Sequence, residues 1–263
     1  MHPLLVFALA AAATWDSWRW YFGRIAAAPE EATTLVLTVA FLGLVGASRL
    51  ARPAPPRTLP LLAIASLLAV LAATHAVLPP IVRAAGAVAL TLFCLYVALF
   101  KERPPVAFWG LVALALPVLP SLQFTLGYPM RVVSAALTTA LLQVHGLAVV
   151  REGTFLAWRD ELIQFDAPCS GVNMLWAGFL LTLMGCVLLR SGILKVMTAI
   201  ALSLVLIVTS NVLRASSLFY VEAGLVPNAP GWWHDGIGIV AFGLSAIAIL
   251  WVLTRLHRGE AIL

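Results

Sequence analysis

Nine apolar runs occupy almost the whole length of this chain and leave only short polar breaks between them. Hydrophobic residues make up 62% of the sequence and charged residues 10%, so a water-soluble fold could not cover its surface with polar side chains. A helix needs about 20 apolar residues to cross a bilayer. The sequence therefore predicts an all-α, polytopic transmembrane helix bundle that forms one integral membrane domain over residues 1–263. The runs fall at about 3–22, 32–48, 59–79, 81–100, 105–120, 132–150, 171–189, 193–220 and 235–254.

Proline-rich breaks separate the apolar runs of the first half. They lie at Arg52–Arg57, Pro79-Pro80 and Pro104-Pro105. Because a proline pushes the residue before it away from helical geometry, each break predicts a turn. The first apolar stretch, Pro3–Thr14, resembles a signal peptide, but no basic segment precedes it and further apolar runs follow it. We interpret this stretch as part of a first span or as a signal anchor.

Arginine and lysine gather in four of the polar breaks. Cytoplasmic loops of membrane proteins are enriched in these residues, so the net charge of +5 indicates topology anchors and does not indicate a nucleic-acid partner. All four breaks then belong on the cytoplasmic side, and an even number of spans must separate each from the next. The basic breaks are Arg49–Arg57, Lys101–Arg103, Arg190–Lys195 and Arg255–Arg258.

One of the three apolar runs between the second and third basic breaks cannot be a simple span under this rule. Run 132–150 is the most polar, so we expect it to lie at the outer interface or to dip into it. In the alternative, the short run 105–120 is the one that does not span. The prediction is about eight spans plus one interfacial helix, with residues 121–170 and 221–234 outside. The polar residues of run 132–150 are Ser134, Thr138, Thr139, Gln143 and His145.

Cys169 lies at the water end of a predicted helix, in the tetrad Pro168-Cys-Ser-Gly171. Ser170 and Gly171 suit a tight turn into that helix. The free amides and the positive dipole at a helix start stabilise a thiolate and could hold a developing oxyanion. The alternative is that Cys169 is only a small residue at a helix cap. Upstream, Gly153–Phe165 alternates in part between apolar and polar residues and predicts a short hairpin over the bundle.

Arg214 lies inside the apolar run 193–220. An arginine within a membrane helix is unfavourable by about 3 kcal/mol or more, and such a residue suggests a functional site. Asn211 and Ser217 lie three residues before and after it, so we expect the three side chains to share one polar helix face. The alternative is that the arginine extends along the helix to reach lipid headgroups. The polar neighbours favour an inward-facing role.

His234 follows the aromatic pair Trp232-Trp233 at the mouth of the last apolar run. A neutral imidazole there could take a proton from a thiol and return it to a leaving amine. The alternative is a polar residue at a helix end. Asp235 comes next, but neighbours on a helix point apart, so it does not orient His234 directly. Cys94 and Cys186 fall within apolar runs and are expected to be small buried residues, and no spacing of His, Cys or carboxylates predicts a metal site.

Taken together, three motifs of this chain resemble those of the exosortase/archaeosortase family of polytopic membrane cysteine transpeptidases. The matching segments are Ala167-Pro-Cys-Ser-Gly171, Asn211-Val-Leu-Arg214, and His234-Asp-Gly-Ile-Gly238 with Phe242. The stretch from Pro129 to Gly153 is similar to the family's approach to its cysteine. The resemblance covers about 129–254, and the histidine of the third motif is similar to the bacterial branch.

The resemblance implies a site and a reaction. Cys169 would be the nucleophile, completed by Arg214 and His234. The supporting residues would be Ser170, Gly171, Asn211, Ser217 and Asp235. The family acts on exported proteins that carry a tripartite C-terminal signal: a short motif such as Pro-Glu-Pro, a spanning helix and a basic cluster. Cleavage would pass through a thioester, which water or an amine or hydroxyl acceptor would resolve.

The expected setting is the plasma (inner) membrane, with the active site on the outer face of a multi-pass protein. The expected partners are the signal-bearing substrates, the lipid bilayer and an acceptor such as a polysaccharide or a lipid. No cofactor, metal or nucleic acid is expected. Two other functions stay open at this point. One is a transporter or lipid- and anion-binding protein of an envelope polysaccharide system, which would need Arg214 but not Cys169. The other is a scaffold in which every polar residue is structural.

Overall fold

The computed structural model describes residues 3–27, 29–50, 58–117, 119–159, 161–164, 170–227 and 230–258. Helices hold 79% of these residues, which confirms the all-α expectation apart from one small sheet. The chain divides into two compact units, which we treat separately. The N-terminal unit is Met1–Leu119 with Arg190–Gly192, and the C-terminal unit is Pro120–Leu189 with Ile193–Leu263. A single domain over 1–263 stays a prediction.

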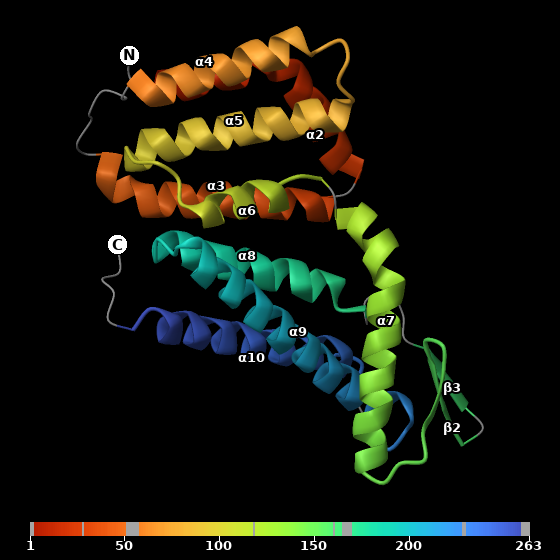
Figure 1. Ribbon diagram of the computed structural model, residues 1–263. Coiled ribbons are helices and arrows are strands. Elements are labelled where there is room, and N and C mark those ends of the chain that lie inside the picture. Colours follow the sequence, from red (N-terminus) through yellow and green to blue (C-terminus); the bar gives the residue numbers. More distant parts are fainter. Residues whose placement is uncertain are drawn as a thin grey trace. The chain divides into compact units, whose positions relative to one another are not determined.

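In the N-terminal unit, α5 is the central helix, and the other five pack against it (Figure 1). Its inward face is closely packed, and Leu90 and Tyr96 are almost fully buried. Tyr21 ties α2 to the end of α6, because its hydroxyl donates to the carbonyl of Ala115 at 2.6 Å. The helices of this unit are α1 (Pro3–Ala13), α2 (Trp15–Ala27), α3 (Pro29–Leu50), α4 (Thr58–Ala73), α5 (Pro80–Phe100) and α6 (Val106–Leu114).

The predicted first span, 3–22, forms two helices that meet at Thr14. The Thr14 hydroxyl donates to the carbonyl of Ala10 at 2.9 Å, and threonine bonds of this kind often accompany a bend in a helix. The charged residues Asp16 and Arg19 lie in the first turns of α2, just after this break.

The turns expected at Pro79-Pro80 and Pro104-Pro105 are confirmed, since α5 begins at Pro80 and α6 follows Pro105.

In the C-terminal unit, α8, α9 and α10 pack against one another. Polar side chains link them: the Thr182 and Ser203 hydroxyls are 2.7 Å apart, and the Ser210 hydroxyl donates to the carbonyl of Ala241 at 2.7 Å. Gly178 allows close approach, because a Cβ there would lie 2.2 Å from Cδ1 of Ile207. Small residues and interhelical hydrogen bonds are typical of packing within a bilayer. The helices of this unit are α7 (Leu119–Val144), α8 (Val172–Leu188), α9 (Ile193–Glu222) and α10 (Trp233–Leu256).

Three of the described helices, α5, α9 and α10, are long and apolar enough to cross a membrane, and a fourth span is possible if the bent pair α6 and α7 counts as one. Shorter apolar helices lie at Ala32–Ala47, Leu62–Ala73 and Val172–Leu188. The multi-pass helical class is therefore confirmed. The count of eight spans stays a prediction.

The boundaries predicted around residues 105–150 were wrong. Run 105–120 contains the nine residues of α6, roughly 14 Å of helix at 1.5 Å per residue, and its last two residues begin α7. Run 132–150 is not a separate helix, since its first part is the second half of α7, which continues through Pro129. The polar residues that suggested an interfacial helix include Ser134 and Thr138, which are buried within the protein.

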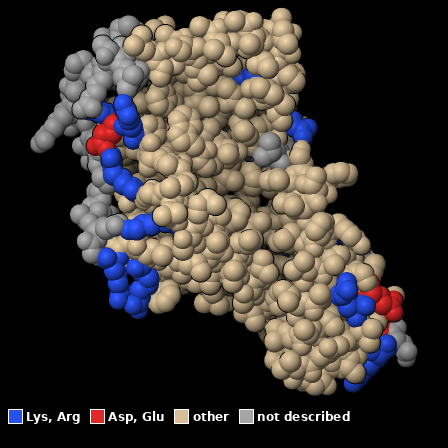
Figure 2. All heavy atoms as spheres, viewed as in Figure 1, with Lys and Arg blue, Asp and Glu red and all other residues tan. Residues whose placement is uncertain are grey.

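Charged side chains lie near the helix ends and leave broad uncharged flanks, as Figure 2 shows for one face. In the N-terminal unit, Lys101 and Arg103 follow the end of α5, and Glu102 pairs with Arg190. In the C-terminal unit, basic residues lie at the start of α9 and the end of α10, and a second charged group lies on the sheet at the other end. The basic residues at the start of α9 and at or just after the end of α10 are Lys195, Arg255 and Arg258, and those of the sheet and its turn are Arg151 and Arg159.

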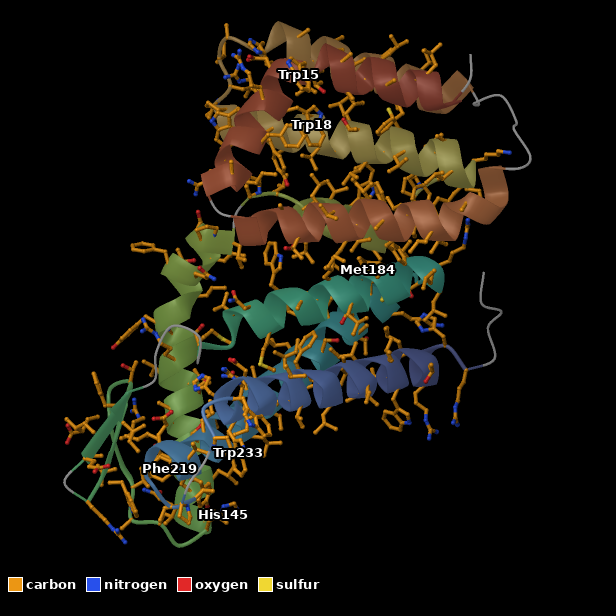
Figure 3. The ribbon with its side chains drawn as sticks, turned by 180° about the vertical axis from the view of Figure 1, so that it is seen from behind. Trp15, Trp18, His145, Met184, Phe219 and Trp233 are labelled. Carbon is orange, nitrogen blue, oxygen red and sulfur yellow. The ribbon has the colours of Figure 1, made fainter. Side chains whose placement is uncertain are left out.

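A three-stranded antiparallel sheet covers one end of the C-terminal unit. Its strands are β1 (Val150–Glu152), β2 (Phe155–Trp158) and β3 (Glu161–Gln164), in the order β1-β2-β3. Leu156 and Trp158 point into a core with Leu142 and Phe219, and the Trp158 and Phe219 rings meet edge to face at 5.9 Å. Figure 3 shows Phe219 at this end of α9. The hairpin expected at 153–165 is thus confirmed for residues 155–164, with one further strand.

Candidate functional site

Arg214 and His234 line the same hollow between α9 and α10. Arg214 comes from α9 and is half-buried, while His234 comes from the first turn of α10 and is exposed. The hollow is also lined by Asp235, which is exposed, and by other residues of the third motif. The structure therefore brings two of the three predicted catalytic residues together. The remaining lining residues are Gly238, Ile239, Phe242 and Gly243.

Gly238 is the point of closest approach between α10 and the Arg214 side chain. A Cβ at this position would lie 3.3 Å from Nε and 3.9 Å from Nη2 of Arg214. Such a contact is tighter than ordinary van der Waals distance, so the guanidinium would have to shift by a few tenths of an ångström to admit a methyl group. The helix thus uses a glycine where it passes the arginine.

The start of α8 has the tight turn that the sequence predicts. Gly171 is the N-cap residue and has φ +76° and ψ 1°, a left-handed conformation that glycine adopts without steric cost. The Ser170 hydroxyl accepts a hydrogen bond from the amide of Val172 at 3.3 Å, and Ser170 is buried. Cys169, the predicted nucleophile, lies outside the described residues.

Asn211 connects the start of α8 to α7 and α9. Its side chain is 1% exposed, and its Nδ2 donates to the Ser134 hydroxyl of α7 at 2.9 Å. On another side it contacts Gly171, where a Cβ would lie 2.9 Å from Cγ of Asn211. Arg214 is three residues further along the same helix. The contact between Asn211 and Gly171 therefore fixes the part of α9 that carries Arg214 against the turn that follows Cys169.

Ser134 is a candidate positioning residue that sequence reasoning missed. It is 2% exposed and bonds to Asn211, whereas its position in an apolar run suggested an interfacial helix. The sequence alone does not show that a serine in an apolar segment has a buried polar partner, because that partner lies on a neighbouring helix. Burial of a hydroxyl without a partner is unfavourable, and the Asn211 amide supplies that partner.

Ser217 does not share the environment of Asn211. It is exposed, and its hydroxyl donates to the carbonyl of Leu213 at 2.9 Å within α9. Each step of three residues turns an α-helix through about 300°, so positions 211, 214 and 217 spread over about 120°. The predicted polar face therefore divides: Asn211 points into the unit, Arg214 lies between, and Ser217 faces outward.

A second hollow extends from Arg214 along α9 and α10. It has a volume of about 530 Å³ and is largely apolar. Ser217, Trp232 and Trp233 lie at the end of the helices where α10 begins, and Leu206 and Ala248 lie further along them. Figure 3 shows Trp233 at this end. The guanidinium thus lies where an apolar groove meets the hollow that holds His234.

Two other histidines of the described residues contact polar groups. Nδ1 of His145 lies 3.0 Å from the hydroxyl of Tyr220, and His75 contacts Arg83. Among the residues that the structure describes, no three His, Cys, Asp or Glu side chains gather as metal ligands would. The described part of this site therefore offers a guanidinium, an imidazole and amide groups for acid–base and anion-binding chemistry.

Comparison with known families agrees with the motif resemblance. The family model described as transmembrane exosortase (Exosortase_EpsH) matches residues 1–251, so the similarity extends through the first 128 residues, where no motif is evident. No curated protein and no solved structure gives a significant match. The family consists of cysteine transpeptidase-like membrane enzymes that process sorting signals. Because the match covers nearly the whole chain, this protein belongs to the transmembrane exosortase family.

Proposed function

We propose that Cys169 cleaves the C-terminal sorting signal of exported proteins, of the Pro-Glu-Pro type, through a thioester. One observation carries the proposal: residues of the second motif, Asn211–Arg214, lie beside residues of the first motif and of the third. Arg214 and His234 line one hollow, and Asn211 contacts Gly171, two residues after the cysteine. A nucleophile, a proton-transfer group and an anion-binding group within one unit suit acyl transfer.

In the proposed reaction, the Cys169 thiolate attacks the carbonyl carbon of the scissile peptide. Arg214 stabilises the oxyanion that forms, or holds a carboxylate of the substrate, with its planar fork of donors. His234 carries the thiol proton to the leaving amine as the carbon–nitrogen bond breaks. Water, an amine or a hydroxyl group then attacks the thioester and releases the product and the free thiol.

The site is proposed to face the outer side of the membrane. Basic residues lie at the opposite ends of α9 and α10, at Lys195, Arg255 and Arg258, and such residues favour the cytoplasm. A substrate with its own spanning helix would diffuse in the bilayer and present its scissile peptide at the level of the α8 start.

One observation favours a second candidate function. The apolar groove that ends at Arg214 also suits a lipid or an anion, as in a transporter or lipid-binding protein without protease activity. Such a protein would depend on Arg214 and tolerate loss of the cysteine thiol.

The test is substrate maturation in cells, followed by size, for Cys169→Ser and Cys169→Ala. We expect both variants to insert into the membrane and leave the substrate uncut. Cys186→Ser is the matched control, because Cys186 is fully buried in α8, and it should process the substrate. Normal maturation by Cys169→Ala would reject the cysteine mechanism and favour the second candidate.

A further inference from the structure

A recess in the N-terminal unit carries charged side chains that the proposed catalysis does not use. It is formed by α1, α2, α4, α5 and the turn between α4 and α5, and its volume is about 220 Å³. This space is equivalent to roughly seven waters at about 30 Å³ each. Part of its lining is apolar, from Leu68, Leu71 and Ala72 of α4, and part is polar, from Asp16, His75 and Arg83.

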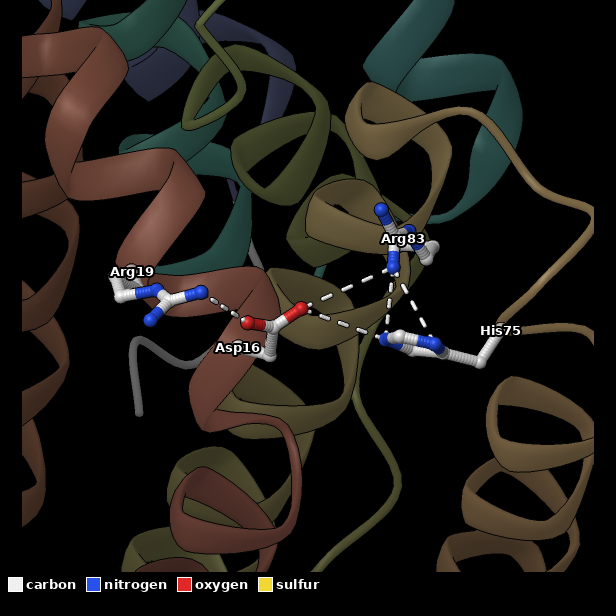
Figure 4. Close-up of polar contacts among 4 residues, drawn as sticks. All are labelled: Asp16, Arg19, His75 and Arg83. Atoms are coloured by element: carbon white, nitrogen blue, oxygen red, sulfur yellow. Dashed lines mark hydrogen bonds and ion pairs between the residues drawn. The ribbon is translucent and has the colours of Figure 1, made fainter.

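The polar residues form one network (Figure 4). Nη1 of Arg83 lies 2.7 Å from Nε2 of His75 and 3.9 Å from Oδ2 of Asp16. Nε2 of His75 lies 3.5 Å from the same carboxylate oxygen. The other oxygen of Asp16 accepts a hydrogen bond from Arg19 at 2.9 Å. Arg19 does not line the recess, so only one of the two guanidinium groups faces it.

Arg83 has donors left for a ligand. Its side chain is 20% exposed, against 76% for Arg19. Its Nε is buried and has no hydrogen-bond partner among the residues that the structure describes. A guanidinium carries five N–H donors, and leaving a buried donor unsatisfied is unfavourable. The hydrogen bond to His75 is made by Nη1, so an acceptor bound in the recess can take the other hydrogens of the two Nη atoms.

The charge balance selects an anion. A guanidinium only donates hydrogen bonds, so Nε2 of His75 is the acceptor in its contact with Arg83. The network then holds two positive charges, on Arg83 and Arg19, against one negative charge on Asp16. The net charge of +1 favours a negatively charged group, and guanidinium groups bind phosphate with good geometry.

The apolar lining and the position select a ligand with a hydrocarbon part. The recess lies at the start of α5, at the other end of that helix from Lys101 and Arg103. Trp15, next to Asp16, is 62% exposed, and exposed tryptophans are common at the membrane–water boundary. Figure 3 shows Trp15 and Trp18 together on α2. An anionic amphiphile meets both requirements at such a boundary.

We propose that this recess binds the phosphate group of a membrane lipid. Arg83 donates to the phosphate oxygens, and the first methylene groups of the lipid contact Leu68 and Leu71 of α4. The site uses none of the proposed catalytic residues and does not depend on the proposed function.

The test is lipid binding to the purified full-length protein in a neutral detergent, measured by native mass spectrometry. The probe is dihexanoyl phosphatidic acid, with dihexanoylglycerol and inorganic phosphate as competitors. We expect one bound probe, no competition from the uncharged glycerolipid, and only weak competition from inorganic phosphate. Arg83→Gln should weaken binding about tenfold or more, since charged hydrogen bonds are the strong ones.

Two further variants make the result decisive. Arg19→Gln removes the same charge outside the recess and should change binding by no more than about threefold. Asp16→Asn removes the carboxylate that repels phosphate and should tighten binding. This variant tests the proposal even if Arg83→Gln fails to fold. Absence of a bound probe, equal effects of Arg19→Gln and Arg83→Gln, or weaker binding by Asp16→Asn would overturn the proposal. Equal affinity for inorganic phosphate would overturn the lipid assignment.

Discussion

Replacing Gly171 with alanine tests whether the turn before α8 and Asn211 hold each other in place. The backbone at Gly171 has φ +76°, which is unfavourable by about 1–2 kcal/mol for a residue with a Cβ. The added methyl would also lie 2.9 Å from Cγ and 3.0 Å from Nδ2 of Asn211. Asn211 must then move, and its hydrogen bond to Ser134 is lost.

The second contribution is on the order of 1–3 kcal/mol, because it leaves buried polar groups unpaired. The total destabilisation is therefore about 2–5 kcal/mol. Substrate processing should fall further than stability alone implies, since Asn211 lies one turn from Arg214 and beside the residues that follow Cys169.

Gly224→Ala is the matched control. Gly224 also has a positive φ of +65°, but nothing lies within 4 Å of a Cβ added there, so only the backbone term of about 1–2 kcal/mol applies. The assays are the thermal midpoint of each purified variant and substrate cleavage normalised to enzyme in the membrane fraction. If Gly171→Ala loses no more stability or activity than Gly224→Ala, the contact with Asn211 is unimportant.

Three further outcomes are expected. Gly238→Ala should lower substrate cleavage by at least roughly threefold through displacement of Arg214, whereas Gly43→Ala in α3, with open space around its Cβ, should cleave normally; equal cleavage by both would reject the role of Gly238. Arg214→Lys should insert normally but lose on the order of a hundredfold in cleavage, and near-normal cleavage would make the arginine an anchor. A membrane-impermeant maleimide added to intact cells should label Cys169 but not the buried Cys186, and labelling only after permeabilisation would refute the outer location.

Most helix positions could be predicted from the sequence, because burial in a bilayer imposes a long apolar run on each helix. Run 81–100 corresponds to α5, and run 235–254 corresponds to α10. The breaks were less predictable. Pro129 lies inside α7 and does not end it, while Thr14 separates two helices within a continuous apolar run. A sequence cannot distinguish a proline that kinks a helix from one that ends it.

The candidate site could likewise be predicted from the sequence only in part. Arg214 and His234 could be proposed from the sequence, because each is recognisable without its neighbours. Arg214 is a charge inside an apolar run, and His234 is an imidazole just before another. The contacts of Asn211 with Ser134 and of Gly238 with Arg214 depend on which helices are neighbours. That information is absent from a single apolar pattern, so the residues that support the arginine emerged only from the packing of α7, α9 and α10.

The sheet at the end of the C-terminal unit shortens the free connection between α7 and α8. Five residues, 165–169, separate the end of β3 from Ser170. If the sheet detached from Phe219 and Leu142, the free segment would begin after Val144 and contain 25 residues, 145–169. A fivefold longer loop raises the free-energy cost of closing it by about 1.4 kcal/mol. A change that detaches the sheet would therefore destabilise the C-terminal unit without altering any proposed catalytic residue, because the folded helices would have to close a longer loop.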